Sequence, residues 1–242
     1  MIIDSKNIEE AKLIELANPK NKEILEIGCG SGRQAFLLAP FCTKYVATDT
    51  NNDVIKSNKS KITKKLSKKL EFSVANGEKL PYSSNSFDTV LMTLCLHEIP
   101  IQKQGIVLQE IHRVLKNKGQ LLIIDPTEPP DQVQSAFNVV YDNFQFFDHS
   151  TVVKHSMWAI KKAISNNLFK INKLSTYKLD WKFDNLKEFV DFIIDCSKDI
   201  NWDKNKRQFL EKELIKIAKI KNINNSVIIY DGLTVNNLIK IK

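Results

Sequence analysis

Short apolar runs alternate with amphipathic stretches over the first half of the chain. Alternation of this kind predicts βαβ units and a mostly parallel sheet. The apolar runs predict strands at Glu23–Ile27, Tyr45–Thr48, Glu71–Ala75, Phe87–Thr93 and Gln120–Ile124. Apolar positions with a period near 3.6 predict helices at Ile8–Ala17, Gln34–Ala39, Asp53–Leu66 and Gln104–Leu115, the last one ended by Lys118-Gly119.

The pattern changes after Asp125, where three prolines and then many aromatic residues follow: Pro126, Pro129, Pro130, Phe137, Tyr141, Phe144, Phe146 and Phe147. Beyond them the pattern predicts helices at Val152–Asn166, Leu186–Ile194 and Lys206–Ile220, with a strand at Ile171–Phe183. The chain closes with Val227–Tyr230 and Leu233–Ile241, which form either one bent strand or a tight hairpin about Asp231-Gly232.

The most specific local feature is Glu26-Ile27-Gly28-Cys29-Gly30-Ser31-Gly32, directly after the first long strand. Alternating glycines let the backbone turn sharply and approach a ligand, and the helix that follows presents free N–H donors. The spacing is G-x-G-x-G, with Arg33 where a dinucleotide fingerprint has its third glycine. By itself this loop predicts a nucleotide-like ligand.

Asp49 ends the second predicted strand, seventeen residues after Gly32. A carboxylate at that point can accept hydrogen bonds from both ribose hydroxyls of a nucleotide. It can also cap the next helix. The glycine turn upstream favours the ribose interpretation.

Composition adds a weak signal of binding to phosphates. The net charge is +8, and Lys56–Lys69 holds seven lysines and no acidic residue. Such a run can meet nucleic acid through nonspecific electrostatics. With only three arginines in the chain, the usual bidentate phosphate ligands are scarce, and a solvated helix face is favoured.

Cellular setting and metal binding are inferred from what the sequence lacks. Cys29, Cys42, Cys95 and Cys196 are scattered without metal-ligand spacing, so no metal site and reduced thiols are expected. No apolar run approaches the roughly 20 residues of a membrane span, and the first ten residues do not resemble an export signal. We therefore predict a cytoplasmic protein.

Five motifs in one order carry a family resemblance: ILEIGCGSG, VATDTN, ANGEKLPYSSNSFDTV, LCLHEI and EIHRVLKNKGQLLIID, between Glu23 and Asp125. Together they resemble the class I methyltransferases that use S-adenosylmethionine (SAM), in particular the ubiquinone/menaquinone C-methyltransferases. The resemblance implies a Rossmann-like, doubly wound α/β fold. Its mostly parallel sheet would have seven strands, the last antiparallel, with helical lid or cap additions. It also implies SAM as cofactor and S-adenosylhomocysteine (SAH) as product.

In that family, the position of Glu26 holds the methionine amino group and the position of Asp49 binds the ribose. The remaining cofactor residues implied by the resemblance lie under the methionine chain (Gly28, Cys29, Gly30, Gly32), against the adenine (Thr50, Asn76, Gly77, Glu78) and beside the methionine part (Thr93, Leu94, with Cys95). Relatives commonly carry Asp at the position of Asn76. Asn keeps an acceptor oxygen for the adenine amine but loses the carboxylate.

The acceptor pocket is expected from His97 and the segment that follows Asp125. His97 lies just past the end of the fourth predicted strand, where it can act as a base, orient the acceptor, or simply pack. We predict that Pro126–Trp158 forms a movable lid whose side chains line the acceptor pocket, namely Tyr141, Phe144, His149 and His155.

The sequence thus predicts one methyltransferase domain over residues 1–242, with a SAM-binding core (1–125), a lid and helix (126–168) and a helical addition (184–225). Its predicted reaction is transfer of a methyl group to a small molecule by in-line displacement at the sulfonium. An RNA acceptor, a SAM- or SAH-binding module without catalysis, and an NAD-dependent oxidoreductase are the alternatives. A monomer or a homodimer is expected.

Overall fold

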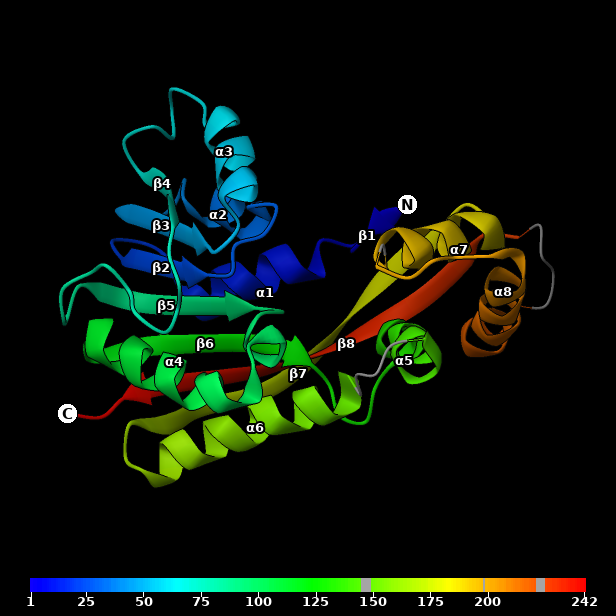
Figure 1. Ribbon diagram of the computed structural model, residues 1–242. Helices are drawn as coiled ribbons and strands as arrows, with labels where there is room; N and C mark the ends of the chain where they lie inside the picture. The colour runs from blue at the N-terminus through cyan, green and yellow to red at the C-terminus, as the bar shows by residue number, and fades with distance from the viewer. Residues whose placement is uncertain (145–148, 198, 221–224) are drawn as a thin grey trace. The chain divides into compact units, whose positions relative to one another are not determined.

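The computed structural model describes residues 1–144, 149–197, 199–220 and 225–242, and they form two compact units (Figure 1). The larger unit contains Glu10–Asp125, His155–Ser175 and Thr234–Lys242. The smaller unit contains Met1–Glu9, Pro126–Lys154 and Thr176–Leu233.

The strands form one sheet in the order β1-β7-β8-β6-β5-β2-β3-β4. Their bounds are β1 (Ile2–Ile3), β2 (Glu23–Ile27), β3 (Lys44–Asp49), β4 (Leu70–Val74), β5 (Phe87–Thr93), β6 (Leu115–Pro126), β7 (Phe169–Phe183) and β8 (Val227–Lys240). The pairs among β2, β3, β4, β5 and β6 are parallel. In Figure 1, β8 runs against β6. The predicted Rossmann-like α/β fold with an antiparallel last strand is therefore confirmed.

An eighth strand adds to the seven predicted, because Ile2 and Ile3 pair antiparallel with Lys182 and Trp181 of β7. The last two predicted segments are one continuous strand, β8, so the bent-strand interpretation is right and the hairpin is wrong.

The helices follow the predicted alternation in the first half of the chain. Their bounds are α1 (Ile8–Ala17), α2 (Arg33–Leu38), α3 (Asn52–Ser60), α4 (Ile101–Val114), α5 (Gln132–Phe144), α6 (His149–Ser165), α7 (Leu186–Asp195) and α8 (Lys204–Ala218), with a 3-10 turn at Leu96–Glu98. The described helices include none long and apolar enough to cross a membrane.

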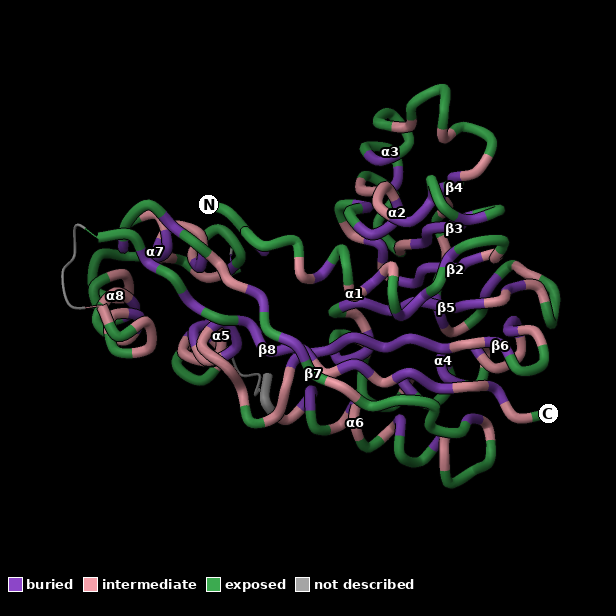
Figure 2. The backbone as a smooth tube through the Cα atoms, turned by 180° about the vertical axis from the view of Figure 1, so that it is seen from behind, coloured by how far each residue is buried: buried purple, intermediate pink, exposed green. Residues whose placement is uncertain are grey.

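Burial in the core of the larger unit explains why the sequences of its central strands are apolar runs. Helices on both faces bury strands such as β2, in which Ile24 and Leu25 have no exposed surface. Figure 2 shows β2, β5 and β6 mostly buried. Val107, Leu108 and Ile111 of α4 pack on this core. Each such side chain stabilises the fold by about 1.5–3 kcal/mol.

Helix α3 ends at Ser60, six residues before the predicted end at Leu66. The residues beyond it hold lysines four apart, Lys61 with Lys65 and Lys64 with Lys68, and no acid. Like charges at this spacing destabilise a helix. The basic run is therefore mostly an exposed turn region.

The predicted helix end at Lys118-Gly119 is wrong, because α4 ends at Val114 and these residues lie within β6. Leu115 pairs with Phe87 of β5 but Gln120 pairs with Thr89, so the residues between them bulge out of the ladder. Lys118 has φ of 62°, and a Cβ on Gly119 would lie 2.8 Å from the Lys116 carbonyl oxygen. Gly119 is therefore required by the β-bulge and does not cap a helix.

The smaller unit has its own core, in which α5, α7 and α8 pack with each other and with β7 and β8. Asn185 and Asp203 cap α7 and α8 with side-chain acceptors. Helix α5 was not predicted, because prolines and irregular aromatics hide its period. Helices α7 and α8 do lie between the last two strands of the chain, as predicted.

Candidate functional site

The glycine loop follows β2 at the point where the strand order reverses. Strand β2 lies between β5 and β3, and α/β proteins of this type bind ligands beyond the carboxyl ends of such strands. Gly28, Gly30 and Gly32 have φ of 75°, 47° and 78°, values that side chains disfavour. The amides of Gly28 and Cys29 both donate to the Thr48 carbonyl, at 2.8 and 2.9 Å, which ties the loop to β3.

The three glycines serve different purposes. A Cβ on Gly28 would lie 2.2 Å from Cys95 Sγ, and one on Gly32 would lie 3.0 Å from Phe72. Those two glycines are required by packing. A Cβ on Gly30 would meet no atom within 4 Å, so the loop leaves open space there.

Asp49 ends β3 with its carboxylate directed back at this loop. Its Oδ2 accepts from the Gly30 amide at 3.0 Å, and its Oδ1 accepts from the Asn51 amide at 2.9 Å. Helix α3 is capped by Asn51, whose side chain accepts from Asp53 and Val54. The capping alternative for Asp49 is therefore wrong.

A cavity of about 440 Å³ opens beside these groups, within the larger unit. The predicted cofactor residues that line it are Gly28, Gly30, Asp49, Thr50, Asn76, Gly77, Glu78 and Leu94. Cys95, expected beside the methionine part, also lines it, as do residues without a predicted role: Ile27, Ala75, Glu98, Ile99, Pro100 and Val107. Most of these are next to predicted residues in the sequence. Val107 lies on α4, and nothing in the sequence around it predicts a place in this cavity.

The loop after β4 is held in shape by Asn76. Its Oδ1 accepts from the Glu78 amide at 2.9 Å, and its Nδ2 donates to Glu78 Oε1 at 3.2 Å. Lys103 also donates to Glu78 Oε1, at 2.8 Å, and lowers the pKa of that carboxyl. The amide at position 76 therefore shapes this wall of the cavity.

Four predicted cofactor residues lie outside the lining, namely Glu26, Cys29, Gly32 and Thr93. Glu26 is 1% exposed and its Oε2 accepts from the Tyr45 hydroxyl at 3.0 Å. Burial raises the pKa of Glu26 to about 8, against the opposing effects of Tyr45 and Arg33. A cationic partner would reverse that shift.

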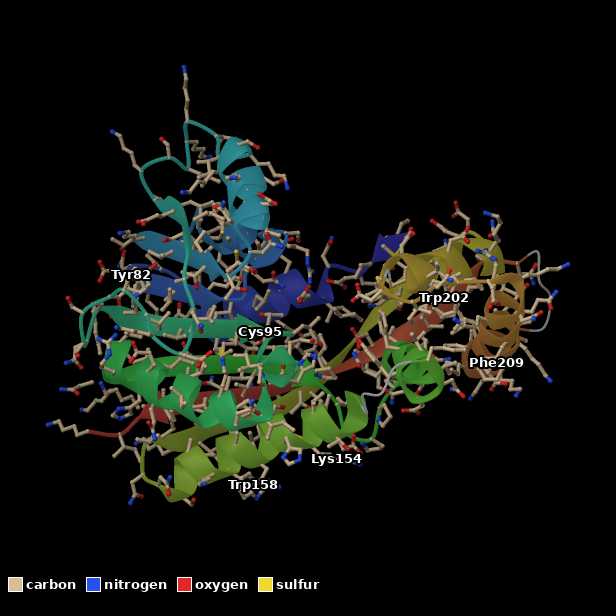
Figure 3. All side chains as sticks on the ribbon, in the orientation of Figure 1. Tyr82, Cys95, Lys154, Trp158, Trp202 and Phe209 are labelled. Atoms are coloured by element: carbon tan, nitrogen blue, oxygen red, sulfur yellow. The ribbon has the colours of Figure 1, made fainter. Side chains whose placement is uncertain are left out.

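The thiols near the loop are unsuited to nucleophilic chemistry. Burial raises the pKa of Cys29 to about 12, and burial raises that of Cys95 still further. Both are therefore neutral thiols near pH 7. In Figure 3, Cys95 lies beyond the end of β5.

His97 lies between two carboxylates in the 3-10 turn after β5. Its Nδ1 is 2.9 Å from Asp125 Oδ1 and its Nε2 is 3.1 Å from Glu98 Oε1. Burial alone would lower the pKa of His97, but the hydrogen bonds to Asp125 and Glu98 outweigh it and raise the pKa to about 9. At neutral pH the ring is an imidazolium that donates to both carboxylates.

Two buried polar atoms at the same edge have no hydrogen-bond partner in the described part of the chain, Thr93 Oγ1 and Asp125 Oδ2. They end neighbouring strands, since Thr93 pairs with Ile124. A buried polar group without a partner is costly, so both atoms are suited to meet a ligand.

The predicted acceptor residues are distributed over both units. Phe144 packs edge-on against Trp202 and Phe209, with ring centroids 5.3 and 5.6 Å apart, and these two rings are labelled in Figure 3. Tyr141 is half-buried on the same helix. His155 lines a cavity between α4 and α6 that is separate from the one beside Asp49. The side chain of His149 lies outside the described residues.

Comparison with known proteins agrees with this geometry. The family model described as a methyltransferase domain matches residues 25–123. The uncharacterized methyltransferase YcgJ of Bacillus subtilis is 26% identical over 114 residues, which is 47% of this chain and 44% of that protein. The ubiquinone/menaquinone biosynthesis C-methyltransferase UbiE of Sinorhizobium fredii is 31% identical over 141 residues, 55% of this chain and 53% of that protein. The chain thus spans about half the length of the curated relatives it matches.

A solved structure extends the likeness of fold beyond the matched segment. A suspected methyltransferase of Bacillus halodurans superposes with a TM-score of 0.69 at 21% identity, covering 97% of this chain and 99% of that one. Its likeness supports the whole fold, and the family model supports the segment that carries the cavity. Residues 25–123 of this chain therefore match the methyltransferase domain, in a fold like that of the class I family whose cofactor is SAM.

Proposed function

We propose that this protein transfers the methyl group of SAM to a small-molecule acceptor. The observation that carries the proposal is the cavity at the carboxyl ends of β2, β3 and β5. It combines an open glycine turn at Gly30 with a carboxylate, Asp49, held in place by two backbone amides. Similarity to methyltransferases over about half of the chain supports it.

The residues fit the cofactor. Open space above Gly30 leaves room for the methionine chain, and Asp49 would accept both ribose hydroxyls. Thr50 and the loop from Asn76 to Glu78 would border the adenine. Glu26 would receive the methionine ammonium, since it is a buried carboxyl without a cationic hydrogen-bond partner among the described residues.

SAM supplies an electrophilic methyl group when it is bound. The chain contributes an apolar wall of Leu94, Cys95, Ile99 and Val107, which keeps water from that part of the cavity. In-line displacement depends mainly on holding the acceptor atom near the methyl carbon. A general base is needed only where the acceptor must lose a proton early.

His97 acts as a positioning residue in this proposal. An imidazolium that donates to Asp125 and Glu98 has no lone pair with which to accept a proton. It instead fixes the carboxylate of Glu98, which lines the cavity.

A small acceptor is supported by the relatives, which include ubiquinone/menaquinone biosynthesis C-methyltransferases. The lid predicted for Pro126–Trp158 stays a prediction. Phe144 packs on two aromatic rings of its own unit, Trp202 and Phe209, and so holds α5 in place there.

The test follows tritium from methyl-labelled SAM into a small-metabolite extract and, in parallel, into total RNA. Label in the small-molecule fraction, lost with Asp49→Ala, supports the proposal. Label in RNA instead would indicate an RNA acceptor, bound through the basic run Lys56–Lys69. Tight SAH binding without turnover in either fraction would indicate a binding module, and binding of NAD but not SAH would overturn the cofactor assignment.

A further inference from the structure

A second cavity of about 400 Å³ lies within the larger unit, between α4 and α6. Its volume falls in the range of small-molecule sites. Among the described residues, it shares no lining residue with the cofactor cavity. A ligand bound here would therefore be present in addition to SAM.

A glycine in the middle of α4 makes this hollow. Gly105 lies within the helix, where glycine lowers helix stability relative to alanine. Packing does not require it, because a Cβ on Gly105 would meet no atom within 4 Å. The missing side chain instead leaves the floor of the cavity open.

The wall opposite carries an aromatic ring beside a cation. Trp158 of α6 is 61% exposed and is labelled on that helix in Figure 3. Lys162 Nζ lies 5.3 Å from the centre of the Trp158 ring. Ile101 and Ile106 of α4 are also exposed, at 41% and 47%. Planar apolar rings are suited to such a surface.

The charge of the lining favours an anion. Lys162 and His155 are the basic residues of the lining, and none of its described residues is acidic. Gln102, Gln109 and Asn166 add amide groups that can donate to a carboxylate or sulfonate.

A buried acceptor in the lining lacks a donor. The amide nitrogen of Gln104, Nε2, donates to the carbonyls of Ile99 at 3.0 Å and Leu96 at 3.3 Å. These two bonds fix the orientation of the side-chain amide. Its Oε1 is buried and accepts no hydrogen bond in the described part of the chain, although Gln104 has no exposed surface. A ligand N–H or O–H would satisfy it.

We propose that this cavity binds a planar aromatic anion that carries an N–H or O–H donor. The ring stacks on Trp158 above Gly105, the anionic group faces Lys162, and the donor meets Gln104 Oε1. Because Gln104 also holds the backbone of Leu96 and Ile99, the ligand contacts a side chain that supports the wall of the cofactor cavity.

The probe is 8-anilinonaphthalene-1-sulfonate, which has the ring, the N–H donor and the negative charge. Its fluorescence is titrated with the full chain, with and without saturating SAH. We expect one bound probe per chain, with SAH leaving its affinity unchanged. Displacement by SAH would place the probe in the cofactor cavity and overturn the proposal.

Variants of Gly105 give a matched pair. Gly105→Leu should weaken the probe at least tenfold by filling the hollow, whereas Gly105→Ala should change its affinity less than about twofold, since a Cβ there meets open space. Trp158→Ala should also weaken binding of the probe. Because Trp158 is exposed, this variant should fold and can replace Gly105→Leu if the latter does not. Equal affinity across all folded variants would overturn the site.

Two related probes test the ligand chemistry. N-phenyl-1-naphthylamine lacks the sulfonate and 8-phenoxynaphthalene-1-sulfonate lacks only the N–H donor, so each should bind more weakly than the parent probe. Lys162→Gln should weaken the parent about two- to fivefold and leave the neutral analogue unchanged. If Trp158→Ala instead converts a dimer to a monomer in sedimentation and the probe has no effect, the hollow is a contact between two copies and the proposal fails.

Discussion

We expect the protonation of Glu26 to link cofactor affinity to pH. This carboxyl is buried, and its pKa of about 8 means that it is mostly protonated at pH 6.5 in the free protein. A bound ammonium requires the ionised form. Ionising Glu26 at pH 6.5 costs about 2 kcal/mol, which corresponds to about 30-fold in SAM or SAH affinity.

The raised pKa of Glu26 sets the direction in which SAH affinity changes with pH. Binding of the ammonium ligand releases a proton from Glu26, so affinity should rise about tenfold per pH unit between pH 6 and 8 and level off above the pKa of about 8. Isothermal titration calorimetry of SAH in two buffers of different ionisation enthalpy measures both the affinity and the number of protons released.

Two controls isolate the side chain. Glu26→Gln keeps the shape of the residue but cannot ionise, and it should weaken SAH at pH 8 and remove the pH dependence. 5′-Methylthioadenosine lacks the amino acid part, so its affinity should be independent of pH in the wild-type protein. An unchanged slope in Glu26→Gln, or the same slope for both ligands, would show that Glu26 does not receive the ammonium.

Four other changes test the site and the fold. Asp49→Ala should weaken SAH by about 1.5–3 kcal/mol in calorimetry, because it removes charged hydrogen bonds to the ribose; wild-type affinity in a folded variant would contradict the assignment. Gly30→Val should abolish the thermal shift given by SAH while the protein stays folded, because φ of 47° disfavours a branched side chain and that side chain would fill the open space that the ligand needs; a retained shift would mean the loop is misassigned. For His97, whose pKa rises from 6.5 to about 9 on folding, the stabilisation of about 3 kcal/mol is complete below pH 6.5 and lost as pH rises through 9. His97→Gln should lack that part of the pH dependence in urea unfolding, and a curve parallel to the wild type would refute it. Phe144→Ala should lower the unfolding midpoint with SAH affinity unchanged, because it removes two edge-on ring contacts; a fully stable variant would argue against its packing role.

Local sequence patterns suffice to predict the half of the chain that carries the glycine loop and its neighbouring strands. Strands such as Glu23–Ile27 and Phe87–Thr93 are recognisable because buried parallel strands are apolar on both faces. The glycine turn and Asp49 are likewise local signals, since a turn with positive φ needs glycine and a strand end fixes where its last side chain lies. These features depend on a few consecutive residues, so the pattern of the chain suffices to find them.

Features that depend on residues distant in sequence could not be predicted before the fold was known. The division of the second half into parts of two units, the pairing of Ile2–Ile3 with β7, and the bulge at Gly119 all depend on partners elsewhere in the chain. The hydrogen bond between His97 and Asp125 joins residues 28 positions apart. It helps to raise the pKa of His97, so that this candidate base is an imidazolium at neutral pH. Burial, charge and hydrogen-bond partners set the chemistry of a side chain, and folding brings those partners together.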